Sequence, residues 1–178
     1  MAETIKQTEA IPASYPSVSP RWVIEQAPED EVPDDAQIWQ RIESYIAYRW
    51  TERQVIWIVQ GCGEWVPPLT PTTITTVECW QGGEWVEATP VATALGGYDF
   101  AGDGPYRITA DVGSGTPPAA VQEAFKRLHE YSRGIVDSFK NQPAQIGDSE
   151  DGIMANWTAR ALQLSGAADL LRPYRRAP

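Results

Sequence analysis

Hydrophobic residues recur at the three-to-four-residue spacing of an α-helix in three segments of the chain. The first helix is predicted to start at Asp34 or Asp35, where acidic side chains suit a helix N-terminus, and to run to about residue 51. The second is predicted to open at Thr116, which two prolines follow, and to end near Ser138. A short helix is expected over residues 154–164. The pattern therefore predicts two long helices and a short C-terminal one.

Between the two long helices the pattern changes to that of β-strands. Gly82-Gly83 predicts a tight hairpin, because glycine at both turn positions tolerates a positive φ. The runs rich in β-branched and aromatic residues are 53–60, 64–66, 72–81, 84–89 and 106–112. We therefore expect an α+β fold, in which a small helical domain carries a β-hairpin and a small antiparallel sheet as an insertion over about residues 53–113.

The hairpin predicts its own cross-strand pairs. A turn at Gly82-Gly83 pairs Trp80 with Trp85 at a non-hydrogen-bonded position, where side chains come closest. The same face then brings Glu78 opposite Glu87, which is unfavourable unless a basic partner or water screens the two carboxylates. The Trp pair could stiffen the hairpin, contact a subunit or tail protein, or stack on a sugar.

The remainder divides into an arm and a C-terminal segment. Residues 1–33 contain five prolines and an acidic cluster, which predicts an extended arm. A folded domain is expected over residues 34–139. Residues 140–178 are expected to hold a mobile loop and then a C-terminal segment with an apolar face and a basic tip. Since a short tethered helix is marginal in water, this segment either binds another surface or packs back on its own domain.

Charge excludes one class of function. The 178 residues include 14 Lys and Arg against 24 Asp and Glu, a net charge of −10, which argues against general binding of DNA or RNA. Residues 1–36 carry two basic and eight acidic side chains, whereas residues 160–178 carry four basic and one acidic. This asymmetry favours contacts between copies or with a partner, unless both ends are merely solvated.

Catalytic chemistry is not indicated. His129 is the only histidine, so multi-histidine metal sites are excluded, and no partner marks it as catalytic. Cys62 and Cys79 are too few for a disulfide scaffold, and we expect both to be reduced. No apolar run reaches the length of a membrane span, and no signal peptide is evident. We expect no enzyme and no cofactor; a hydrolase using Glu78 and Glu87 is a further alternative.

Four stretches of the chain resemble the head–tail connector (adaptor) proteins of tailed phages and of phage-derived gene transfer agents. One begins at Asp34-Asp-Ala-Gln-Ile-Trp, one is Gly104-Pro-Tyr-Arg-Ile-Thr-Ala, and one begins at Pro117-Pro-Ala-Ala-Val. The fourth is Ala159-Arg-Ala-Leu-Gln-Leu-Ser-Gly-Ala-Ala-Asp-Leu-Leu-Arg-Pro-Tyr-Arg-Arg176. The Pro-rich arm departs from the short polar lead that is usual in the family.

The resemblance implies a structural virion protein, made in the bacterial cytoplasm. It would form a ring, usually of twelve copies, beneath the portal protein, extend the DNA channel without binding DNA specifically, and dock a stopper or tail-terminator protein. The segment that grips the portal in this family corresponds here to Trp157, Arg160, Leu162, Leu164, Leu170, Leu171, Arg172, Tyr174, Arg175 and Arg176. The alternative function is a Trp-rich carbohydrate-binding module, as in a phage fibre.

Overall fold

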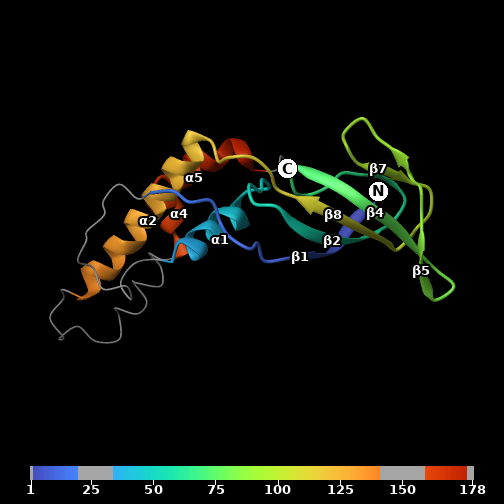
Figure 1. Ribbon diagram of the computed structural model, residues 1–178, viewed down its shortest axis with the longest axis horizontal. Coiled ribbons are helices and arrows are strands. Elements are labelled where there is room, and N and C mark those ends of the chain that lie inside the picture. The colour runs from blue at the N-terminus through green and yellow to red at the C-terminus, as the bar shows by residue number, and fades with distance from the viewer. Residues whose placement is uncertain (1, 20–33, 141–158, 176–178) are drawn as a thin grey trace. The chain divides into compact units, whose positions relative to one another are not determined.

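The computed structural model describes residues 2–19, 34–140 and 159–175 (Figure 1). The chain divides into two compact units. Residues 1–14 and 48–115 form one, which we call the sheet unit, and residues 15–47 and 116–178 form the other, the helical unit. Each unit is therefore built from two separate stretches of sequence.

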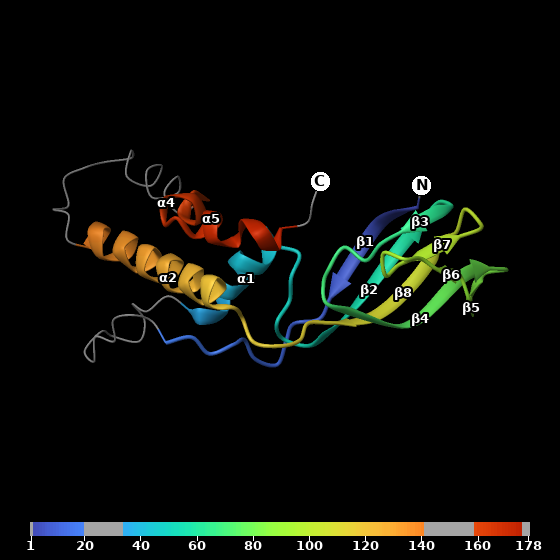
Figure 2. The same ribbon diagram turned by 90° about the horizontal axis from the view of Figure 1, so that it is seen from above.

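The sheet unit contains a five-stranded antiparallel sheet in the order β1-β2-β8-β4-β5, whose strands lie side by side in Figure 2. Its strands are β1 (Glu3–Glu9), β2 (Arg53–Gln60), β8 (Tyr106–Val112), β4 (Thr72–Gln81) and β5 (Glu84–Glu87). In β2 and β8 every second residue is buried, as expected for strands with one face on a core.

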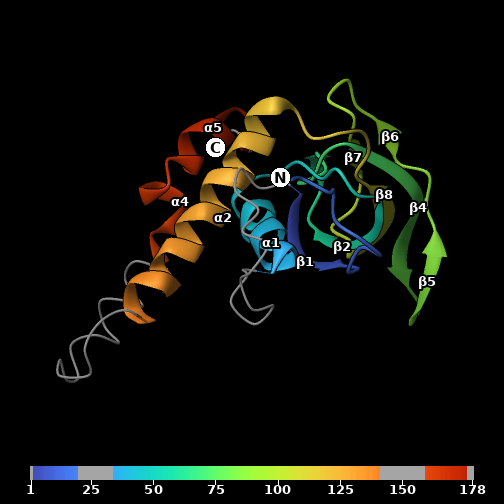
Figure 3. The same cartoon turned by 60° about the vertical axis from the view of Figure 1, so that its left-hand side comes forward.

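A smaller antiparallel sheet, in the order β3-β7-β6, completes the sheet unit; β3 is labelled in Figure 2, and β7 and β6 in Figure 3. It consists of β3 (Gly63–Trp65), β7 (Tyr98–Phe100) and β6 (Val91–Ala92). Its aromatic residues join the core of the larger sheet: the Trp65 ring meets Trp57 edge-on at 5.6 Å between centroids, and Phe100 stacks on Tyr106 at 4.1 Å. Glycine is required at position 97, where a Cβ atom would lie 1.9 Å from the Trp65 carbonyl oxygen.

The helical unit contains one long helix, α2 (Ala119–Lys140), and several short ones. The short elements are α1 (Asp35–Tyr45), α4 (Ala161–Leu164), α5 (Ala167–Leu171) and a 3₁₀ turn, η2 (Arg172–Tyr174). The Asp34 carboxylate caps α1 by accepting from the Ala36 N–H at 2.9 Å. Trp39 stacks on Phe125 at 5.0 Å, and this pair joins α1 to α2 in the core.

The expected fold class is wrong, because the described residues are rich in sheet. They form eight strands in two antiparallel sheets, and α2 is the only long helix among them. The first predicted helix ends early, at Tyr45, and the chain then runs extended into the sheet unit. Ile46 and Trp50 fit the helical spacing, yet Ile46 is buried in the helical unit and Trp50 in the sheet unit.

The other element predictions have mixed outcomes. The strands predicted at 53–60, 72–81 and 106–112 have the observed bounds, and the strand at 84–89 is two residues shorter. Helix α2 starts at Ala119, so the first turn after Thr116 is not helical. Of the short helix predicted at 154–164, residues 154–158 lie outside the described residues, and residues 161–164 form α4.

The N-terminal residues contain a strand that the sequence did not predict. Residues 3–9, expected within an extended arm, form β1 and pair with β2. The Trp57 indole N–H donates to the Gln7 side-chain oxygen at 2.9 Å, and the Trp65 indole N–H donates to the Thr4 hydroxyl at 2.8 Å. In the helical unit the Pro16 carbonyl accepts from the Trp39 indole at 2.9 Å. Much of the predicted arm is therefore part of the two folded units.

Candidate interaction surfaces

The β4–β5 hairpin has the predicted register. Trp80 is paired with Trp85, and Glu78 with Glu87. The turn residues Gly82 and Gly83 have φ values of 60° and 93°, and a Cβ atom at either position would meet nothing within 4 Å. Glycine is therefore favoured at this turn by the positive φ values and not by a lack of space.

The two Trp rings of the hairpin meet edge to face, with 5.1 Å between their centroids. Trp80 is 45% exposed, whereas Trp85 is half-buried beneath the Arg107 guanidinium, which lies 4.7 Å from the centre of its ring. Arg107 comes from β8, directly opposite Glu78. Of the two rings, only that of Trp80 is thus nearly half exposed, which does not favour the paired sugar-stacking surface that the sequence left open.

Arg107 is also the basic partner that the two opposed glutamates require. Its Nε and Nη2 atoms both donate to the Glu78 carboxylate at 2.6 Å. This hydrogen bonding lowers the pKa of Glu78 and raises that of Arg107. Glu78 is therefore held as an anion, so it is unsuited to be the proton donor of the hydrolase considered above.

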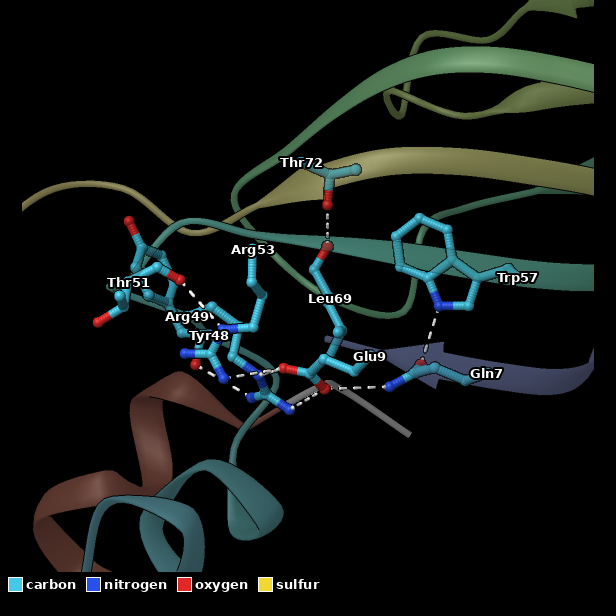
Figure 4. Close-up of polar contacts among 9 residues, drawn as sticks. All are labelled: Gln7, Glu9, Tyr48, Arg49, Thr51, Arg53, Trp57, Leu69 and Thr72. Carbon is cyan, nitrogen blue, oxygen red and sulfur yellow. Dashed lines mark hydrogen bonds and ion pairs between the residues drawn. The ribbon is translucent and has the colours of Figure 1, made fainter. Parts of the chain in front are cut away.

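A second polar cluster, in the sheet unit, is partly buried and joins β1 to the chain around β2 (Figure 4). The Glu9 carboxylate accepts from Arg49 Nε at 2.6 Å, from Arg49 Nη2 at 3.2 Å and from Arg53 Nη1 at 3.2 Å. Both arginines are buried. They also donate to the carbonyl oxygens of Tyr48 and Thr51. These contacts tie the end of β1 to residues 48–53, which gives the cluster a structural role.

The C-terminal segment packs on its own helical unit. Ala161, Ala167 and Leu171 are fully buried there, and the Ala47 N–H donates to the Tyr174 carbonyl at 3.1 Å. The Arg175 guanidinium lies 4.7 Å from the centre of the Tyr45 ring. The sequence left two arrangements open for this segment. In the structure of the single chain, the segment packs back on its own unit.

The residues expected to contact a portal protein fall into three groups. Leu171 is buried, and Leu162, Leu170 and Tyr174 are half-buried. Trp157 and Arg176 lie outside the described residues. The exposed members are Arg160, Leu164, Arg172 and Arg175. Among the described members of this set, a partner can therefore reach three basic side chains and one leucine, which is 54% exposed.

His129 is buried in the helical unit and does not have the half-exposed position of an ordinary helix residue. Its ring stacks on Phe125 at 6.1 Å, and its Nε2 atom lies 3.8 Å from an Asp35 carboxylate oxygen. Burial lowers the pKa of His129, although the Asp35 charge acts in the opposite direction. The described surroundings contain no nucleophile in hydrogen-bond contact with this ring, so we assign it a packing role.

The lowered pKa of His129 predicts a loss of stability in mild acid. The unfolded chain binds a proton at about pH 6.5 and the folded chain only at lower pH, so the free energy of unfolding falls as the pH drops below about 6.5. Urea unfolding at pH 7.5 and pH 5.5 should show a smaller acid loss for His129→Gln than for the wild type. An equal acid loss in both proteins would contradict this assignment.

The residues that the structure describes contain neither a candidate metal site nor a candidate membrane-spanning helix. No group of three or more His, Cys, Asp or Glu side chains there is placed to hold a metal ion. Cys62 is exposed and Cys79 half-buried, and neither forms a disulfide. No described helix has the length and apolar character that crossing a bilayer requires.

Comparisons with protein-family models, curated proteins and solved structures found no match to this chain.

Proposed function

We propose that this protein is a head–tail connector (adaptor) of a phage or gene transfer agent particle, which binds the portal protein through its C-terminal segment. The observation that carries the proposal is the exposed basic set Arg160, Arg172 and Arg175 on the segment that resembles the family most. Arginine is enriched at the contacts that dominate protein interfaces. Residues 160–178 carry a net charge of +3, whereas the rest of the chain sums to −13.

The packing of the segment is compatible with a docking role. Ala161, Ala167 and Leu171 anchor α4 and α5 to the helical unit, so the exposed side chains are displayed on an ordered support. Arg172 pairs with Asp169 at 2.8 Å, but both side chains are more than three-quarters exposed, and such a surface pair is weak. An acidic portal surface can therefore displace Asp169 at little cost.

The acidic character of the sheet unit suits the proposed ring around a DNA channel. The unit carries four Lys and Arg side chains against ten Asp and Glu, a net charge of −6. DNA gains affinity from counterion release when cations contact its phosphates, and a carboxylate-rich wall provides no such gain. In the proposed particle, DNA passes through a homo-oligomeric ring without being held, and a stopper or tail-terminator protein binds the opposite side.

The experiment replaces the exposed charges without touching the core. In Arg172→Glu/Arg175→Glu, we expect co-sedimentation with the portal protein to fall at least about tenfold, because two interface cations become anions. Lys6→Glu, an exposed charge reversal on β1, is the matched control and should bind like the wild type. Circular dichroism should be the same for all three proteins. Unchanged binding by the double variant would refute the proposed portal contact, as would an equal loss in Lys6→Glu.

A further inference from the structure

The smaller sheet carries a pair of opposed carboxylates on its exposed face. Glu64 of β3 lies directly opposite Asp99 of β7, and both side chains are exposed. Among the described residues, none forms an ion pair or a hydrogen bond with either carboxylate. Like charges in direct opposition are unfavourable. In the larger sheet the opposed residues Glu78 and Glu87 have a cation beside them, because Arg107 binds Glu78. The pair in the smaller sheet has no such cation from the described chain.

An exposed apolar residue completes this face. Val91 of β6 lies opposite Asp99 on the other side of β7 and is 71% exposed. Because directly opposed residues point to the same side of a sheet, Glu64, Asp99 and Val91 form one row across the three strands. The neighbouring residues Trp65 and Phe100 point to the core on the other side. We call Glu64, Asp99 and Val91 the acidic row.

Helix α4 displays a complementary pair of side chains. Arg160 and Leu164 are exposed, whereas Ala161 between them is buried. The Leu164 N–H donates to the Arg160 carbonyl at 2.9 Å, so the two residues are one helical turn apart and share a face. No described carboxylate pairs with the Arg160 guanidinium. One turn of the helix therefore places a cation beside an apolar side chain.

The two surfaces match in spacing as well as in charge. Neighbouring strands of a sheet lie about 5 Å apart, and one such step separates Asp99 from Val91. Residues four apart on a helix have Cβ atoms about 5–6 Å apart. A helical turn laid across β7 and β6 can therefore place Leu164 on Val91 while Arg160 reaches both carboxylates. Arginine suits this position because its planar fork donates to two acceptors at once.

A second copy of this chain is the occupant that the charges favour. The net charge of −10 divides into +3 over residues 160–178 and −13 over the rest, so each copy contains both members of a complementary pair. The acidic row belongs to the sheet unit and α4 to the helical unit. A contact between these two surfaces of different copies is head-to-tail, and each copy can then bind two others, as a closed ring requires.

We propose that Arg160 and Leu164 of one copy bind the acidic row of a second copy. The guanidinium lies between Glu64 and Asp99, and the leucine side chain covers Val91. This contact joins neighbouring copies of the proposed ring and in that respect rests on the proposed function, but it is a property of the free protein. It assigns Arg160 to the neighbouring copy and leaves the other exposed arginines of the segment to the portal protein.

Sedimentation equilibrium of the free full-length protein tests the contact. We expect association that increases with protein concentration and that salt reverses, since opposite charges hold the surfaces together. Glu64→Gln/Asp99→Asn and Arg160→Gln should each weaken the association at least about tenfold, because each removes one side of a charge-assisted contact. The control Glu3→Gln/Glu84→Gln changes the net charge by the same two units at exposed positions of the larger sheet and should associate like the wild type.

A mixture of the two binding variants tests the head-to-tail geometry. Glu64→Gln/Asp99→Asn retains Arg160, and Arg160→Gln retains the acidic row. At a concentration at which each variant alone is monomeric, the equimolar mixture should form one-to-one pairs that do not grow further, because only one of the two possible contacts is intact. Circular dichroism should be the same for all of these proteins.

Three outcomes would overturn the proposal. They are a wild-type chain that stays monomeric at about 1 mM, an equal loss of association in the control, and a mixture that contains no pairs. These measurements contain no portal protein, so they are separate from the co-sedimentation of Arg172→Glu/Arg175→Glu. Either the contact between copies or the portal contact can therefore fail without the other.

Discussion

Replacing Glu9 with alanine should lower the free energy of unfolding of the sheet unit by about 3 kcal/mol, the usual effect of removing one partner from a buried ion pair. Glu9 receives hydrogen bonds from both Arg49 and Arg53, whose side chains are only 7% and 3% exposed. Without the carboxylate, these two buried cations lose the anion that they share. Removing a carboxylate that binds a buried guanidinium is costly, because the guanidinium stays protonated at any accessible pH and remains in the protein interior.

The matched control for Glu9 is another glutamate of the same strand. Glu3→Ala removes an exposed carboxylate at the other end of β1 and should change the free energy of unfolding by less than about 0.5 kcal/mol. Urea denaturation followed by circular dichroism measures both variants. A loss below about 1 kcal/mol for Glu9→Ala would show that the cluster does not hold β1 in the sheet.

Trp39→Ala should have an equal or larger effect, about 4 kcal/mol, on the helical unit. The Trp39 ring is fully buried, stacks on Phe125 and donates its indole N–H to the Pro16 carbonyl. The substitution leaves a large cavity between α1 and α2 and an unsatisfied carbonyl oxygen.

A second tryptophan provides the comparison for Trp39. Trp80→Ala removes a ring that is nearly half exposed and should cost about 1 kcal/mol, mostly the edge-to-face contact with Trp85. Thermal unfolding of the two variants should therefore show a much larger fall in Tm for Trp39→Ala. Equal shifts, or a larger one for Trp80→Ala, would contradict the assignment of Trp39 to the core.

Local signals in the sequence predicted the hairpin and several of the strands. Gly82-Gly83 determines the register of β4 and β5, so Trp80 and Glu78 could be paired with Trp85 and Glu87 from the sequence alone. Arg107 could not be found in this way, because it lies 29 positions from Glu78 and only the pairing of β8 with β4 brings the two together. The requirement for a basic partner was predictable, whereas the identity of the partner was not.

Strand β1 carried no periodic signal that could reveal it. A strand with one buried face usually alternates apolar and polar residues, but the residues of β1 that bind buried side chains are polar. Gln7 binds the Trp57 indole, Thr4 binds the Trp65 indole, and Glu9 binds two arginines. Since each polar group is satisfied by a residue distant in sequence, the strand resembles a polar tail until the fold is known.

The length of the first helix was overestimated, because its apolar spacing continues beyond the residue at which the helix ends. Trp50 continues the three-to-four-residue spacing that starts at Ile38, and spacing alone predicts that the helix continues. The structure instead buries Trp50 in the sheet unit, where the Arg49 N–H donates to the Thr70 carbonyl at 2.8 Å. Tertiary pairing thus overrides a local helical pattern after Tyr45.

Electron microscopy of the portal protein mixed with the full-length chain tests the proposed function most directly. We expect a ring of additional density on the portal, coaxial with its channel, and the loss of that ring with Arg172→Glu/Arg175→Glu but not with Lys6→Glu. Portal particles that carry no additional density at saturating concentrations of the wild-type protein would contradict the proposed function.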